Sequence, residues 1–85
     1  RVAICGGAGD FLLPDAVALG ADAFLTGEMH YHQYFGYEQR IQIAVIGHYQ
    51  SEQFTREIFR DIITRQCPGV RCILSEINTN PIIYF

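Results

Sequence analysis

The sequence predicts an α/β fold with a mostly parallel sheet of about five strands and with three helices. Short apolar runs alternate along the chain with segments that have a helical spacing of apolar residues. Strands that alternate with helices form a largely parallel sheet. Turns that contain glycine or proline close most of these segments. Because 85 residues make one domain at most, we expect residues 1–85 to form a single α/β half-domain.

The composition indicates that this half-domain is part of a longer chain. The sequence opens on Arg1 rather than on an initiator methionine, and Val2 already lies inside an apolar run. Hydrophobic residues make up 49% of the chain. We therefore expect part of the apolar surface to face a missing segment or another subunit.

The first expected unit is a strand, a glycine-rich turn and a helix. Residues 2–5 form an apolar run that stops at Gly6-Gly7-Ala8-Gly9, and Asp10 is the expected N-cap of the helix that follows. Glycines before a helix also occur in phosphate-binding loops. However, Leu12 stands where the dinucleotide pattern needs Gly or Ala, and no Gly-Lys-Ser/Thr sequence is present. A close strand-to-helix turn is the favoured interpretation.

A second strand and a second helix are expected next, followed by a central strand. The second strand covers residues 21–25, and the helix covers residues 31–39, although Gly36 weakens it. Residues 41–46 form an almost continuous apolar run. Such a run is typical of a strand that is covered on both faces.

The last third of the chain is expected to add one helix and two strands. The helix follows His48, carries its apolar residues on one face and ends at Cys67-Pro68-Gly69. Residues 70–74 and 81–85 are the fourth and fifth strands. Pro81 makes the fifth an edge strand, because proline cannot donate to a central ladder.

Charge, cysteine content and hydropathy exclude several classes of protein. Nine acidic residues against six basic ones argue against a nucleic-acid partner, which normally requires a basic patch. The three cysteines lack CxxC spacing and cannot all pair, which fits a reducing, cytoplasmic location. No apolar stretch reaches the roughly 18 residues of a membrane span, and no signal peptide is visible.

His48 and Glu52 are the first candidate site residues. The apolar run stops at Gly47 and a helical pattern begins, so His48 lies where a strand gives way to a helix. Glu52 follows four residues later, and on a helix the two side chains share one face and can bind one divalent ion. Open α/β sheets place their ligands at the carboxyl ends of their strands, which is where His48 would lie. In the alternative interpretation, Glu52 only complements the helix dipole and Ser51 serves as the cap.

A second polar cluster follows the second expected strand, in residues 26–32. In a parallel sheet this loop shares an edge with the turn at His48. Two histidines lie in it, and on a helix His30 and His32 would point about 200° apart. At most one of them should therefore face that edge, and we favour His32.

Three segments together resemble the C-terminal half of the Nif-three-like dinuclear-metal-centre proteins, also known as GTP cyclohydrolase I type 2 homologues. The order and spacing of the segments match the family, the closing Asn78-Thr79-Asn80-Pro81 matches its end, and the resemblance covers essentially all 85 residues. The segments are Val2-Ala3-Ile4-Cys5-Gly6-Gly7-Ala8-Gly9, Thr26-Gly27-Glu28 through Tyr31-His32, and Gly47-His48-Tyr49 with Glu52.

This resemblance implies one half of a two-lobed metal-binding fold. In the family, a cleft between two α/β halves holds two divalent metal ions per full-length chain, and the positions of His48 and Glu52 supply ligands. Thr26, Glu28 and His32 match a segment beside the metals, which makes them expected cleft-lining residues. The family's other ligands come from an N-terminal half that is absent from these residues. One His and one Glu suit Zn, Fe, Mn and Ni alike.

The resemblance also implies two alternative functions. The first is a metal-dependent hydrolase, like GTP cyclohydrolase type 2, that acts on a nucleotide-like small molecule. The second is a non-catalytic oligomeric scaffold or metal carrier. In both cases the expected partners are the N-terminal half of the same chain and further copies in a homo-oligomer. No nucleic acid or membrane partner is expected.

Overall fold

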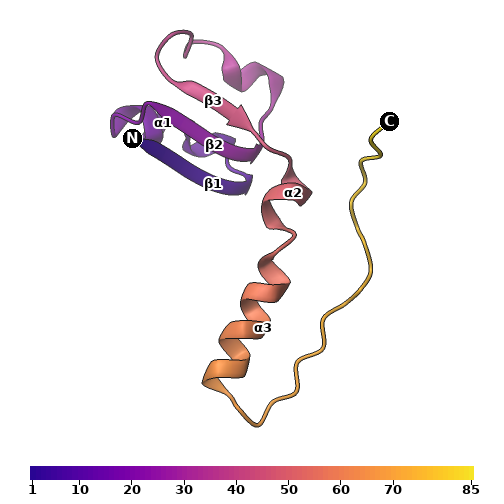
Figure 1. The fold of residues 1–85 in the computed structure, drawn as a ribbon. Helices are drawn as coiled ribbons and strands as arrows, with labels where there is room; N and C mark the ends of the chain where they lie inside the picture. Colours follow the sequence, from indigo (N-terminus) through magenta and orange to yellow (C-terminus); the bar gives the residue numbers. More distant parts are fainter. The chain divides into compact units, whose positions relative to one another are not determined.

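The computed structural model describes all 85 residues, which divide into two compact units, Arg1–Glu52 and Gln53–Phe85. Three parallel strands form the sheet of the first unit, in the order β1-β2-β3 (Figure 1). The strands are β1 (Val2–Ala8), β2 (Ala23–Glu28) and β3 (Gln42–Val45). The predicted α/β fold with a parallel sheet is confirmed.

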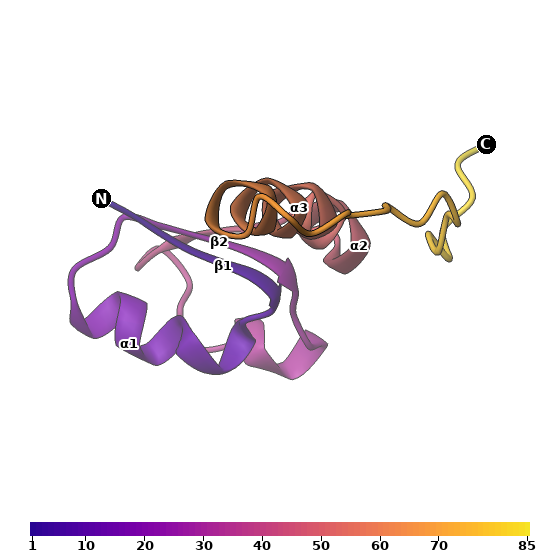
Figure 2. The ribbon, with the colours of Figure 1, turned by 90° about the horizontal axis from the view of Figure 1, so that it is seen from below.

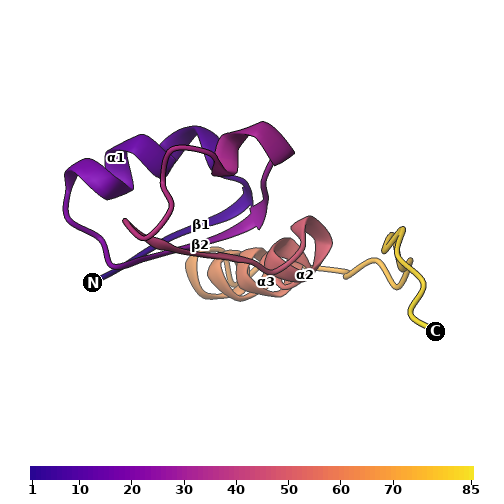
Figure 3. The same ribbon diagram turned by 90° about the horizontal axis from the view of Figure 1, so that it is seen from above.

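Helical segments lie on both sides of this sheet, but Val2 and Ile4 of β1 and Val45 of β3 remain exposed. Strand β3 was expected to be central and covered on both faces, and it is instead an edge strand. The 3-10 turn η1 (Asp10–Leu12) runs into α1 (Leu13–Ala18), and η2 (Tyr31–Tyr34) lies in the connection between β2 and β3. Figures 2 and 3 show α1 and η2 on one side of the sheet and α2 (His48–Glu52) on the other, next to the carboxyl ends of the strands.

The core of the first unit is small and lies between α1 and the sheet. Phe24 of β2 packs with Leu13 and Ala16 of α1, and all three are buried. Partly buried apolar side chains surround them, among them Cys5 of β1 and Ile43 of β3. This core fixes one face of the sheet. Helix α2 contacts β1 and β2 from the other face.

The sheet has three strands, so the prediction of five was wrong. Residues 70–74 and 81–85, which were expected to be strands, have no regular secondary structure. Their apolar composition is typical of strands, but a strand is stable only when its backbone N–H and C=O groups pair with a neighbour. Neither segment joins the sheet of β1, β2 and β3.

The helices also differ from the expected three. The helix expected over residues 31–39 is reduced to the four-residue turn η2, because Phe35 has an extended backbone and Gly36 after it has a φ of 89°, neither of which continues a right-handed helix. The helix expected after His48 is divided into α2 and α3 (Thr55–Gln66). As predicted, α3 ends just before Cys67-Pro68-Gly69.

The role predicted for Asp10 was also wrong. Gly9 is the N-cap residue of η1, and no side chain caps either η1 or α1. Asp10 is instead the first residue of η1 and binds a histidine from the loop after β2. None of the helices combines the length and the apolar composition that a membrane-spanning helix needs.

Candidate metal-binding site

The candidate site lies at the carboxyl ends of the parallel strands. Strand β2 ends at Glu28, and two residues separate the end of β3 from His48, the first residue of α2. Glu52 is the last residue of α2, one helical turn further on. The structure therefore places His48 where the sequence predicts it, between a strand and a helix.

The imidazole of His48 lies between two carboxylates. Its Nδ1 is 2.6 Å from Oε2 of Glu28, and its Nε2 is 3.2 Å from Oε2 of Glu52. The three side chains are each about half exposed. Glu28 comes from the sheet and Glu52 from the helix, so the ring connects the two elements.

The two carboxylates also set the proton affinity of His48. The hydrogen bond with Glu28 is the largest cause that raises the pKa of His48 above its ordinary value, and the negative charge of Glu52 adds to it. Partial burial acts in the opposite direction, because it disfavours the charged ring. Because only the neutral imidazole can bind a metal ion, metal binding at His48 competes with protonation of the ring.

The separation of His48 and Glu52 fits a shared divalent ion. Ligand bonds of about 2.0–2.2 Å place two neighbouring ligand atoms of a tetrahedral or octahedral ion about 3.0–3.5 Å apart. The 3.2 Å between Nε2 of His48 and Oε2 of Glu52 falls in this range. The pair can thus become two ligands of one ion with little movement of either side chain.

Gly7 leaves the space that this pair occupies. It has a φ of 67°, and a Cβ atom at this position would lie 2.4 Å from Oε1 of Glu52 and 3.4 Å from Nε2 of His48. The backbone of β1 thus approaches the pair closely because no side chain is present. The glycine-rich turn, expected to join a strand to a helix, also shapes the site.

Ser51 ties α2 to this turn. Its hydroxyl accepts a hydrogen bond from the backbone N–H of Gly7 at 3.0 Å and donates one to the carbonyl of His48 at 2.8 Å. The sequence offered Ser51 as a helix cap in the alternative interpretation. Its contact with a glycine 44 residues away has no local signal in the sequence, so only the fold identifies it.

Thr26, an expected cleft-lining residue, is buried with 1% of its surface exposed. Its hydroxyl accepts a hydrogen bond from the N–H of Gly9 at 3.1 Å and donates one to the carbonyl of Gly7 at 3.2 Å. These two bonds hold the glycine-rich turn in place. In this structure Thr26 therefore shapes the site through the backbone of β1.

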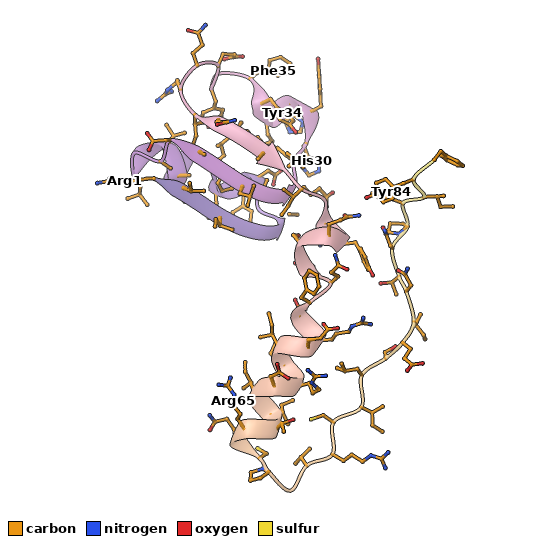
Figure 4. All side chains as sticks on the ribbon, viewed as in Figure 1. Arg1, His30, Tyr34, Phe35, Arg65 and Tyr84 are labelled. Atoms are coloured by element: carbon orange, nitrogen blue, oxygen red, sulfur yellow. The ribbon has the colours of Figure 1, made fainter.

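The two histidines of the 26–32 segment lie close together instead of pointing apart. Their ring centroids are 5.8 Å from each other, because His30 has an extended backbone and only His32 lies within η2. His32 is exposed, and its expected role beside the metals stays a prediction. His30 (Figure 4) makes a different contact, with Asp10.

Asp10 and His30 form a pair that the sequence analysis missed. Nδ1 of His30 lies 2.5 Å from Oδ2 of Asp10, which also accepts the backbone N–H of His30 at 3.3 Å. Asp10 is only 7% exposed. Their hydrogen bond is the main cause that raises the pKa of His30 and lowers the pKa of Asp10. The pair joins the turn after β1 to the loop after β2.

These residues do not form a complete metal site. No group of three or more His, Cys, Asp or Glu side chains is arranged to hold an ion. Glu28 and Glu52 face opposite nitrogens of His48, so the two carboxylates do not converge on one point. Two ligands, His48 and Glu52, are what this arrangement can offer to a single ion.

Known proteins match the chain along almost its whole length. The model of the family Duf34/NIF3 (NGG1p interacting factor 3) matches residues 1–81. A GTP cyclohydrolase 1 type 2 homolog of Archaeoglobus fulgidus is 32% identical over 81 residues, which cover 94% of this chain and 33% of that protein. The homolog of Lactococcus lactis is 34% identical over 85 residues, covering 95% of this chain and 32% of that protein.

A solved structure also matches the chain along its whole length. Staphylococcus aureus protein SA1388 matches 100% of this chain and 29% of its own, with a TM-score of 0.74 and 27% sequence identity. The chain spans about a third of the length of the curated relatives that it matches.

Proposed function

Because the chain belongs to the Duf34/NIF3 family, we propose that it binds a divalent metal ion through His48 and Glu52 and contributes this half of a dinuclear centre. The observation that carries the proposal is the 3.2 Å between Nε2 of His48 and Oε2 of Glu52, on one face of α2. The absence of a side chain at Gly7 supports it, because Oε1 of Glu52 lies only 2.4 Å from where a Cβ atom would stand. The remaining ligands come from outside these 85 residues.

The reaction that we propose is metal-dependent hydrolysis of a nucleotide-like small molecule. The relatives named GTP cyclohydrolase 1 type 2 homologs motivate the substrate class. A bound divalent ion supplies Lewis-acid chemistry and lowers the pKa of a water ligand towards neutrality. In this chain, His48 must lose its proton to become a ligand, and Glu52 neutralises part of the metal charge. The proposed carrier of protons is either Glu28 or His32, which is exposed on η2.

Metal content tests the first step. The full chain is purified without added metal, and its metal is measured by mass spectrometry beside His48→Ala and Glu52→Ala variants. We expect a sharp fall in both variants, whereas a Glu76→Ala control keeps the wild-type content, because Glu76 is exposed and far along the sequence from α2. Equal metal in all four proteins would mean that His48 and Glu52 only hold α2 on the sheet.

Turnover tests the second step. GTP and other nucleotides are incubated with the metal-loaded full chain, and products are separated by chromatography. We expect hydrolysis that His48→Ala abolishes. Unchanged turnover in that variant, or none in the wild type across the nucleotide panel, contradicts the enzymatic proposal and leaves metal binding intact.

A non-catalytic scaffold or metal carrier is the second candidate, and an exposed apolar face favours it. The apolar residues of α3 and its N-cap are all exposed within the second unit, and such a face fits contacts between copies of the chain. These residues are Phe54, Ile58, Phe59, Ile62 and Ile63. Under this alternative, sedimentation gives a homo-oligomer that dissociates when a chelator removes metal, and no turnover is lost.

A further inference from the structure

We propose that Glu28 is a positioning residue that orients the imidazole of His48 for metal binding and is not itself a ligand. The inference rests on the proposed metal site and adds a third residue with a different role. It starts from the unequal contacts that His48 makes with its two carboxylates. Nδ1 is 2.6 Å from Glu28, whereas Nε2 is 3.2 Å from Glu52.

The two distances leave room for different arrangements, although the 3.2 Å contact of His48 with Glu52 is itself an ion pair at the long end of hydrogen-bond distance. A charge-assisted N–H···O⁻ hydrogen bond brings the heavy atoms to about 2.7–2.9 Å, and the 2.6 Å contact of Glu28 is slightly shorter than that, which leaves no room for an ion between the two atoms. Two ligands of one ion stand about 3.0–3.5 Å apart, given bonds of about 2.0–2.2 Å, and the contact of Glu52 lies within this second range. An ion fits between His48 and Glu52, but not between His48 and Glu28.

The fold holds Glu28 more firmly than a loop would. It is the last residue of β2, and its backbone pairs with Ala8 at the end of β1. His48 begins a separate helix, 20 residues later in the sequence. The hydrogen bond therefore fixes the side chain of the first residue of α2 to the central strand of the sheet.

The orientation matters for the chemistry of the ligand. A neutral imidazole carries one proton, and the nitrogen that binds metal must be the unprotonated one. When Nδ1 donates to Glu28, the proton is held on that side and the lone pair of Nε2 points towards Glu52. Histidine ligands commonly donate their second N–H to a carboxylate, and loss of such a partner typically weakens metal affinity 10- to 100-fold.

The test is the affinity of the full chain for Zn²⁺, measured by competition with a chromophoric chelator. Glu28→Ala should weaken binding about 10- to 100-fold, and Glu28→Gln should restore most of the loss, because its amide oxygen still accepts from Nδ1. Glu76→Ala controls for the change in net charge. The cysteines are unchanged in every variant, so Zn²⁺ bound to thiolates contributes equally.

A spectroscopic readout separates orientation from general damage to the fold. Long-range ¹H–¹⁵N spectra of the metal-free protein report which nitrogen of neutral His48 carries the proton. We expect the proton on Nδ1 in the wild type and in Glu28→Gln, and a shift towards Nε2 in Glu28→Ala. A merely structural role for Glu28 would leave this ratio unchanged.

The outcomes distinguish this inference from the proposed function. If His48→Ala and Glu52→Gln weaken Zn²⁺ binding but Glu28→Ala does not, the metal site stands and the positioning role is overturned. If Glu28→Gln weakens binding as much as Glu52→Gln, Glu28 is a ligand and the inference is wrong. If none of these variants changes the affinity, the proposed metal site itself fails.

Discussion

The substitution Gly7→Ala tests the close approach of β1 to the candidate metal ligands. The added Cβ would stand 2.4 Å from Oε1 of Glu52, well inside van der Waals contact, and 3.4 Å from Nε2 of His48. Glu52 is half exposed and can swing away, so relief of the clash is easy. Its movement, however, removes the carboxylate from the position 3.2 Å from His48.

Two separate effects are expected from Gly7→Ala. The backbone φ of 67° is left-handed, and an alanine there costs about 1–2 kcal/mol of unfolding free energy. The displaced carboxylate should weaken Zn²⁺ binding by at least about tenfold. This is the smallest loss of metal affinity that is typical when a group supporting a metal ligand is removed. Urea unfolding measures the first effect, and chelator competition measures the second.

The adjacent substitution Gly6→Ala is the matched control. A Cβ on Gly6 would meet its nearest atoms, all in Ser51 and Glu52, at 3.9 Å, which is an ordinary contact, and its φ is not left-handed. We therefore expect stability and Zn²⁺ affinity close to the wild type. Equal Zn²⁺ affinity in Gly7→Ala and Gly6→Ala would refute the argument that Gly7 leaves room for the ligand pair.

Two further predictions concern the supports of this edge. Thr26→Val keeps the side-chain shape but leaves buried backbone groups of the glycine-rich turn without a partner, so it should lower the unfolding free energy in urea by about 1–3 kcal/mol. Thr26→Ser keeps the hydroxyl and should lose less. Equal losses in the two variants would show that the hydrogen bonds of Thr26 are unimportant for stability. The Asp10–His30 pair should make stability depend on pH. Since the pKa of His30 is raised above 6.5, its contribution is complete below that value and is lost as the pH rises through the raised pKa. Since the pKa of Asp10 is lowered below 3.8, its contribution is complete above that value and is lost as the pH falls through the lowered pKa. Chemical unfolding across pH should therefore show the largest contribution between these limits, and His30→Asn, which keeps a donor but does not titrate, should abolish the loss on the alkaline side. A difference in unfolding free energy between the wild type and His30→Asn that does not vary with pH would contradict this prediction.

The sequence was a good guide where the information is local. The strand that ends before Gly47 and the helix that starts at His48 follow from neighbouring residues, and the spacing of His48 and Glu52 places both on one helical turn. The parallel order of the strands also follows from the alternation of strands and helices. These features need no knowledge of distant contacts.

The sequence failed where the outcome depends on a distant partner. Residues 70–74 and 81–85 have the composition of strands, but composition does not supply a neighbouring strand. The sequence placed the segment after β2 and the turn at His48 at one edge of the sheet, but it did not predict which side chains meet there, such as Glu28 with His48 or Asp10 with His30, each pair being 20 positions apart. Such pairs become visible only when the carboxyl ends of the strands are brought to one edge.

His30 and His48 differ in their carboxylate contacts, and this difference bears on which of them has a structural role and which has a role in metal binding. His30 has one carboxylate partner, Asp10, which is almost completely buried and also accepts the backbone N–H of His30. That arrangement satisfies a buried acid and fastens two turns together. His48 has a carboxylate on each nitrogen, and all three side chains remain half exposed. The contact with Glu52 is an ion pair one helical turn along α2, and its 3.2 Å separation also suits two ligands of one ion, so the metal content of His48→Ala and Glu52→Ala decides between anchoring and metal binding.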